Sequence, residues 1–199
     1  MKNSLHIITF CALVVLVPVA DVFPSGAASQ ACVTMAPRHR STTDPDLVIA
    51  PQESISPYSI VAEGTTYTPG GTVSVSILAK TRDITFQGFL IQARTVGSPL
   101  PVGSFLAGTD GASKLLSCNA TGDSITHTGP EEKQSGMSFT WQAPAASVGK
   151  IQFILAAVKN HDVYWVRMES NTLSASASLS ASMPMLCFLL AVTMATNTL

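Results

Sequence analysis

Polar and apolar residues alternate along the middle of the chain. The segment Thr72–Ile77 puts valine and isoleucine on one face and hydroxyl groups on the other, and Met137–Gln142 repeats this pattern. The second segment is followed by Ala143 and Pro144, and proline cannot continue a β-ladder. Alternation with a period of two is typical of strands that have one buried face, so both segments are predicted to be half-buried strands.

Two more continuously apolar segments follow later in the chain. Ile151–Val158 and Val163–Met168 are separated by Asn160, His161 and Asp162, which favour a turn. The two segments are predicted to form a hairpin close to the core. Further strand candidates are Leu47–Ala50, Tyr58–Val61, Ile84–Arg94, Ser104–Leu106 and Ser124–His127.

The regular spacing of these segments predicts the fold class. About nine short strands separated by turn residues are typical of an all-β antiparallel sandwich with two sheets and Greek-key connections. No segment reads clearly as a helix, because none has a long run of apolar residues at helical spacing. We therefore expect no helix in the folded domain.

The N-terminus has the pattern of a secretory signal peptide. Lys2 is followed by the apolar run Ile7–Val17, which is too short to span a bilayer comfortably. Residues 1–20 are predicted to be removed by cleavage after Ala20, so that the mature chain begins at Asp21. The alternative is a buried or amphipathic first helix, which is less favoured because no polar face interrupts the run.

The C-terminus has the pattern of a glycolipid-anchor signal. A spacer of small and hydroxylated residues, 170–182, precedes a hydrophobic tail, 183–199, whose apolar run is shorter than the roughly 20 residues of a membrane span. The candidate attachment residue lies between Ser170 and Ser176, with Ser174 favoured by its small neighbours and Asn171 as an alternative, and the tail would be removed. A single-pass tail and an uncleaved secreted tail remain as alternatives. The predicted location is therefore secreted, or lipid-anchored at the extracellular face of the plasma membrane.

Cysteine usage predicts one disulfide. Cys11 lies in the predicted signal peptide and Cys187 in the tail, so the remaining domain, residues 21–169, keeps only Cys32 and Cys118. Two cysteines in an oxidising compartment imply one bridge.

An N-glycosylation sequon, Asn119–Thr121, follows directly after Cys118. A glycan needs a surface position, so Asn119 is predicted to be exposed and the chain to be a glycoprotein.

Charge and motifs exclude several classes of protein. All 12 acidic residues and every basic residue except Lys2 lie within residues 21–169, which gives the domain a net charge of about −2. A nucleic-acid-binding domain would have a clear basic excess. The chain has no nucleophile elbow, paired-histidine zinc motif, Cys-x-x-Cys or phosphate-binding glycine loop. We therefore expect no enzyme activity, no cofactor and no nucleic-acid partner.

The histidines and tryptophans are expected to be structural. His39, His127 and His161 are scattered and lack the i, i+2 or i, i+4 spacing of a local metal site, so no metal site is predicted. Trp141 and Trp165 have apolar neighbours, which favours core packing over a role as platforms for a ligand.

Three local basic spots lie in the nearly neutral domain. They are Arg38, His39 and Arg40, then Lys80 with Arg82, and Lys150 with Lys159. If the fold brings two of these spots together, they could hold an anionic sugar or a lipid headgroup. The alternative is ordinary solvated surface charge.

Several segments together resemble a reeler domain, the N-terminal domain of reelin. They follow one another in the family's order and cover nearly the whole predicted domain: Phe23–Ala27, Ala31–His39, Phe86–Arg94, Val102–Phe105, Ile125–Thr128, Phe139–Pro144, Gly149–Phe153 and Tyr164–Val166. The resemblance implies an immunoglobulin-like sandwich, agrees with a bridge between Cys32 and Cys118, and is close to the short secreted defense proteins. The same domain also begins reelin, F-spondin and ferric-chelate reductase 1, in which redox modules follow it.

The resemblance also implies a function. We expect a non-catalytic extracellular recognition module in innate immunity, with a bacterial surface glycolipid or a sulfated polysaccharide as its partner. Arg38, His39 and Arg40 are the candidate ligand-binding residues. One alternative is a structural or adhesive cell-surface protein that binds a protein partner. Another is a ferric-chelate-reductase-like protein that lacks its redox domains.

Overall fold

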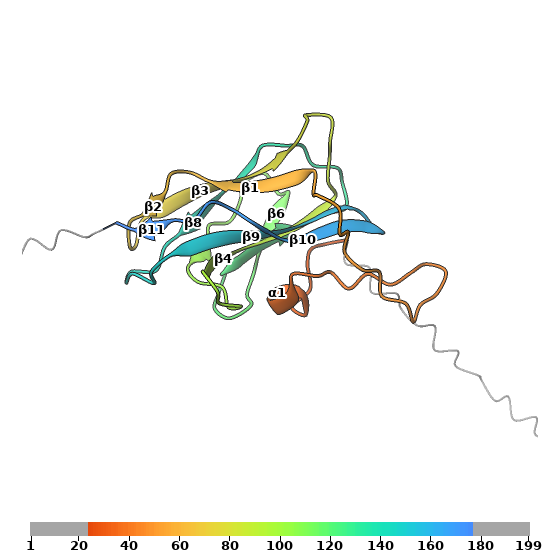
Figure 1. Ribbon diagram of the computed structural model, residues 1–199, viewed down its shortest axis with the longest axis horizontal. Helices are drawn as coiled ribbons and strands as arrows, with labels where there is room; N and C mark the ends of the chain where they lie inside the picture. The colour runs from red at the N-terminus through yellow and green to blue at the C-terminus, as the bar shows by residue number, and fades with distance from the viewer. Residues whose placement is uncertain (1–23, 177–199) are drawn as a thin grey trace, which may run out of the picture.

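A computed structural model describes residues 24–176 of the chain. The predicted signal peptide and the tail 183–199 lie outside these residues. The described part contains eleven strands and one short helix, arranged mainly as two sheets that face each other (Figure 1).

The first sheet has four antiparallel strands in the order β1-β3-β8-β5. These are β1 (Tyr58–Ala62), β3 (Thr72–Ala79), β8 (Met137–Gln142) and β5 (Ser104–Phe105). In β3, Val73, Val75 and Ile77 are buried while the residues between them are at least partly exposed. The half-buried strands that the alternating pattern predicted are confirmed.

The second sheet has five antiparallel strands in the order β10-β9-β4-β7-β6. These are β10 (Val163–Glu169), β9 (Ile151–Asn160), β4 (Gly88–Thr95), β7 (Ser124–His127) and β6 (Ser113–Leu116). The predicted hairpin is β9 and β10, which turn at His161 and Asp162. Strand β4 is buried along seven of its eight residues, because both of its faces are covered.

The core between the sheets confirms an all-β, immunoglobulin-like sandwich. Trp141 from the first sheet is fully buried and packs edge-on against Phe153 of the second, with ring centroids 5.5 Å apart. Its indole Nε1 donates to the carbonyl of Val102 at 3.0 Å. Trp165 is only partly buried, and its Nε1 donates to the carbonyl of Ser54 at 3.0 Å.

The outer face of the second sheet is also covered. Residues 24–57, which we call the N-terminal strap, cross this face and carry α1 (Ala31–Thr34), which lies below the sheet in Figure 1. Ala31 and Met35 pack there against Leu90 and Ala156 in a second apolar cluster. The expectation of no helix was wrong, because four residues are too few to produce a helical period in the sequence.

The folded domain continues past Glu169. Leu173 is fully buried in the main core, and its amide and carbonyl pair with Ile151. The next residues form β11 (Ser174–Ala175), which pairs in parallel with β2 (Thr66–Tyr67). The first part of the predicted spacer therefore belongs to the sandwich. No helix within residues 24–176 is long and apolar enough to cross a membrane.

Candidate functional site

A disulfide fixes α1 to the sandwich. Cys32 and Cys118 are bonded, with their Cα atoms 5.5 Å apart, which confirms the predicted bridge. Cys32 lies in α1, and Cys118 lies in the loop after β6. The bridge therefore holds the N-terminal strap against the outer face of the second sheet.

A buried arginine reinforces this attachment. Arg94 of β4 is 1% exposed, and its Nη2 donates to the carbonyls of Cys32 at 2.8 Å and Val33 at 3.2 Å. Its Nε also donates to Gln92 Oε1 at 2.9 Å, and Gln92 in turn contacts Cys118 Sγ at 3.2 Å. Because the carbonyls at a helix end lack partners within the helix, the guanidinium supplies the donors that α1 needs.

A hollow lies between the strap and the second sheet. Its volume is about 120 Å³, and it is partly open to solvent. Ala27, Ala31 and Met35 line it from the strap, and Leu90 and Ala156 line it from the sheet. No Asp, Glu, Lys or Arg residue lines the hollow, and its ionisable side chains are histidines.

Three histidines that are distant in sequence line this hollow. They are His39, His127 and His161, and no spacing in the sequence indicated that they would share it. The rings of His39 and His161 stack with centroids 4.9 Å apart. His127 lies against Gly88, where an added Cβ would come within 2.9 Å of its Cε1. Glycine at position 88 therefore makes room for the ring.

Two of the histidines make hydrogen bonds through Nδ1. His127 Nδ1 lies 3.1 Å from the amide of Phe89, and it is also 3.2 Å from both the Phe89 carbonyl and Thr126 Oγ1. His39 Nδ1 lies 2.7 Å from the carbonyl of His161, so this nitrogen carries the proton. Burial lowers the pKa of His39, although the hydrogen bond to that carbonyl opposes the shift. His39 is therefore neutral at pH 7. Among residues 24–176, no three His, Cys, Asp or Glu side chains gather in a way that could hold a metal ion.

The structure separates the three predicted ligand-binding residues. Arg38 is exposed and has a left-handed backbone, with φ of 57°. His39 is buried and faces the hollow. Arg40 is partly exposed, and its Nη1 donates to the carbonyl of Pro45 at 2.7 Å. Arg38 is thus the member of the trio that is most open to a ligand.

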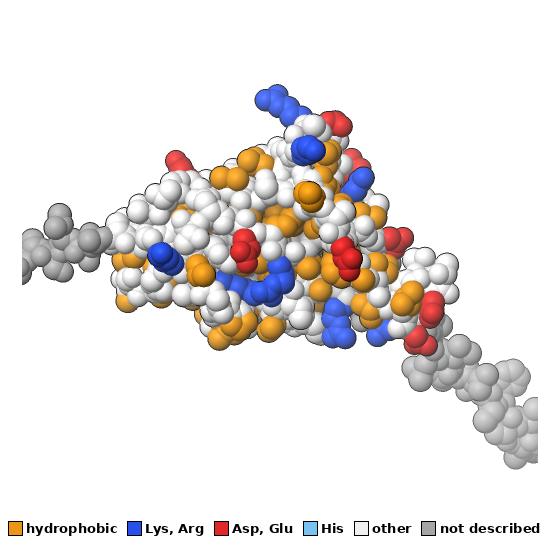
Figure 2. All heavy atoms as spheres, viewed as in Figure 1, with side chains coloured by type: hydrophobic (Ala, Val, Ile, Leu, Met, Phe, Trp, Pro, Cys, Tyr) orange, Lys and Arg blue, Asp and Glu red, His pale blue; other side chains and the backbone are white. Residues whose placement is uncertain are grey.

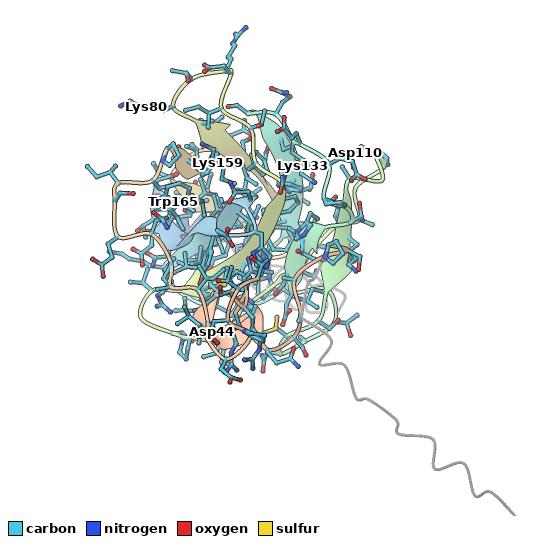
Figure 3. The ribbon with its side chains drawn as sticks, turned by 90° about the vertical axis from the view of Figure 1, so that its right-hand side faces the viewer. Asp44, Lys80, Asp110, Lys133, Lys159 and Trp165 are labelled. Atoms are coloured by element: carbon cyan, nitrogen blue, oxygen red, sulfur yellow. A yellow bond between two sulfur atoms is a disulfide. The ribbon has the colours of Figure 1, made fainter. Side chains whose placement is uncertain are left out.

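The other basic spots do not join Arg38. Lys150 and Lys159 lie at opposite ends of β9, so they cannot act as one site. Lys80 lies at the end of the molecule opposite Asp44, which belongs to the strap (Figure 3). Positive and negative side chains are both scattered over the face shown in Figure 2, without a large area of one sign.

The predicted glycosylation site lies on a tightly bonded loop. Asn119 is exposed, and the buried carboxylate of Asp123 accepts the backbone amides of Cys118, Asn119 and Ala120 at 2.6 to 2.9 Å. The Asn119 side chain takes no part in these bonds. The predicted anchor residue, Ser174, lies in β11, where its amide donates to the carbonyl of Thr65 at 3.0 Å.

Comparison with known proteins agrees with this architecture. The fold is that of human F-spondin's reeler domain, with a TM-score of 0.53 at 19% identity over 64% of this chain and 94% of that structure. Residues 30–180 match the model of the Reeler domain. The chain belongs to the Reeler domain family.

Two groups of relatives match the chain over about four fifths of its length. "Putative defense protein 3" of Antheraea mylitta is 33% identical over 159 residues, and the match covers 90% of that protein. "Putative defense protein Hdd11" of Hyphantria cunea is also 33% identical, and the match covers 94% of it. "Putative ferric-chelate reductase 1 homolog" of Drosophila melanogaster is 30% identical, but the match covers only 25% of it. The family makes this an extracellular domain.

Proposed function

We propose that this domain is a non-catalytic recognition module of innate defence. Its ligand is an anionic glycoconjugate, either a bacterial surface glycolipid or a sulfated polysaccharide. The ligand binds the N-terminal strap through Arg38. This role is supported by the likeness to "Putative defense protein 3" and "Putative defense protein Hdd11", which covers at least nine tenths of each of them. The exposed position of Arg38 beside an apolar hollow is the observation that carries it.

The backbone around Arg38 supports a binding role because it is rigid. The amide of Ile49 donates to the carbonyl of His39 at 2.8 Å, and the amide of Ser41 donates to the carbonyl of Leu47 at 2.9 Å. These bonds hold both sides of the strap around Arg38. A guanidinium on a fixed backbone loses less conformational entropy when it binds phosphate or sulfate, and it offers these groups a pair of parallel donors.

Salt dependence and one substitution test this function. The full chain is titrated with lipopolysaccharide and with heparin at increasing salt. Affinity should fall as salt rises, because screening weakens contacts between charges. Arg38→Ala should reduce affinity by roughly tenfold, which corresponds to one charge-assisted contact of about 1.5 kcal/mol.

The matched control is Arg82→Ala. Arg82 is also an exposed arginine, and it lies two residues from Lys80 in another part of the surface. This substitution removes the same charge and should leave affinity nearly unchanged. Equal losses in the two variants would mean that only net charge matters, and the proposed site would be abandoned.

A second function is favoured by one surface. The outer face of the sheet β1-β3-β8-β5 has no charged residue on its strands, and its outward side chains are mainly hydroxyl groups. Val61 and Leu78 are 43% and 38% exposed on this face. Surfaces that bind proteins are depleted in charge at their centre, so an adhesive role with a protein partner would use this face. Such binding would be insensitive to salt and would be lost in Val61→Lys but retained in Arg38→Ala.

Lipid anchoring through Ser174 also remains a proposal. Attachment there would remove Ala175, which pairs with Tyr67 in β11 and β2. A phosphatidylinositol-specific phospholipase should release the protein from animal cells that express the full chain. Retention at the surface after this treatment would contradict the anchor.

A further inference from the structure

The hollow beneath α1 exists because small side chains face each other across it. Ala27, Ala28 and Ala31 line it from the strap, and Ala156 lines it from β9. Each alanine side chain is a single methyl group, so these positions leave space that larger side chains would fill. Leu90 and Met35, which are 2% and 1% exposed, complete apolar walls around this space.

The chemistry of the walls selects an apolar occupant. No Asp, Glu, Lys or Arg side chain lines the hollow. Its titratable groups are the three histidine rings, and the buried His39 is neutral at pH 7. The carboxylate of Asp162 lies beside one of these rings and accepts a hydrogen bond from His161 Nδ1 at 2.6 Å. An apolar group that enters this space is removed from water without leaving a buried charge unpaired.

The size of the hollow limits the occupant to a short segment. Its volume of about 120 Å³ is somewhat less than that of an engineered cavity of about 150 Å³ that binds benzene. A methylene group needs roughly the space of a water molecule, about 30 Å³. The hollow therefore has room for about four carbon atoms of an alkyl chain, and not for a complete fatty acyl chain.

The position of Arg38 gives the occupant a charged end. Pro37 and His39 both line the hollow, and Arg38 lies between them with its side chain exposed. Arg38 does not itself line the hollow, so a headgroup held by it would lie outside the hollow, in solvent. We propose that the hollow binds an alkyl segment of about four carbons that is joined to an anionic headgroup held by Arg38. This inference rests on the proposed function and selects a glycolipid over a sulfated polysaccharide.

A series of alkyl sulfates tests the inference. The full chain, labelled with ¹³C at the methionine methyl groups, is titrated with methyl, ethyl, propyl, butyl, hexyl and octyl sulfate at constant ionic strength. The Met35 methyl signal reports binding, because Met35 lines the hollow. Affinity should rise about fourfold for each added methylene up to about butyl sulfate, and then level off. Met137 does not line the hollow and is the internal reference.

Three variants distinguish binding of the ligand's alkyl chain from binding of its headgroup. Ala28→Leu places a larger side chain at the wall, and it should abolish the dependence on chain length while methyl sulfate binds as before. Ser29→Leu adds the same side chain at an exposed neighbour that does not line the hollow, and it should keep the dependence. Arg38→Ala should weaken every alkyl sulfate by the same factor and leave the dependence on chain length intact.

Several outcomes would overturn the inference. Equal affinity for methyl and butyl sulfate would exclude an alkyl site in the hollow. If lipopolysaccharide still bound through Arg38 in that case, the proposed function would stand and only this inference would fail. Chain-length dependence that persists in Ala28→Leu would place the alkyl segment elsewhere. Absence of binding by the alkyl sulfates, lipopolysaccharide and heparin would overturn both proposals.

Discussion

Arg94 Nη2 lies 2.8 Å from the carbonyl oxygen of Cys32, so a buried guanidinium of the second sheet bonds the end of the helix that carries the disulfide. Arg94 Nη1 is buried and has no hydrogen-bond partner among the residues that the structure describes. Burial lowers the pKa of Arg94, and the nearby charge of Arg167 lowers it further, but an arginine stays protonated. The charge is therefore retained in the interior to hold the strap.

Arg94→Met should destabilise the domain by about 2 kcal/mol. The substitution keeps much of the side-chain volume but leaves the carbonyls of Cys32 and Val33 without their donor. Urea unfolding measures the loss. Arg167→Gln is the control, because it removes the neighbouring exposed charge without breaking these bonds, and its stability should be unchanged or slightly higher. An unaltered midpoint in Arg94→Met would show that the disulfide alone holds α1.

Gly103→Ala should destabilise the domain by about 3 kcal/mol or more. Gly103 has a φ of 68°, and a Cβ there would meet the ring of Trp141 and the carbonyl of Gln142 at 2.5 Å. Backbone strain and overpacking then add. Gly97→Ala is a matched control, because φ is 83° but no atom lies within 4 Å of its Cβ, and it should lose only about 1 kcal/mol. Equal losses would show that backbone strain accounts for the whole effect.

His39 should make stability fall as the pH drops below about 6.5. Burial holds the pKa of His39 in the folded protein below its ordinary value of 6.5, so the unfolded chain binds the proton first. The neutral His39 ring therefore makes its full contribution to the free energy of unfolding above pH 6.5. This contribution is lost as the pH falls toward the pKa of His39 in the folded protein. Urea midpoints at pH 7.5 and 5.5 measure this, and the difference should shrink in His39→Phe. The same difference in both proteins would assign the pH dependence to other groups.

Asn119 should carry a glycan when the chain is secreted from animal cells. The side chain is exposed, and the buried Asp123 shapes its loop through backbone amides alone. Treatment with an N-glycosidase should lower the apparent mass, and Asn119→Gln should abolish that shift with little effect on stability. Secreted protein whose mass does not respond to the enzyme would contradict this assignment.

The sequence predicted the sandwich well where one face of a strand is apolar. The alternation in Thr72–Ile77 and the boundaries Ser124–His127 agree with β3 and β7, and the pair of mature cysteines agrees with the disulfide. Strand β6 was missed because Lys114 and Leu115 are both exposed, so its residues do not alternate. Predicted strand Leu47–Ala50 is only a bridge between Val48 and Arg40.

The candidate site could be predicted only in part. Arg38 stood out as local basic charge, and it is exposed in the structure. The hollow depends on α1, on alanines from separate elements and on Gly88, none of which forms a local pattern. His39 and His161 are brought together because the strap folds back over the turn after β9. Contacts across such a distance in sequence leave no period or motif.

Hydrogen exchange with and without lipopolysaccharide tests the central claim most directly, because it locates the bound ligand on the full chain. Bound lipopolysaccharide should slow exchange in the strap around Arg38, including the amides of Ser41 and Ile49, and this protection should vanish in Arg38→Ala. Protection that appears instead around Lys80, or on the outer face of the sheet β1-β3-β8-β5, with the strap unchanged, would contradict the proposed recognition site.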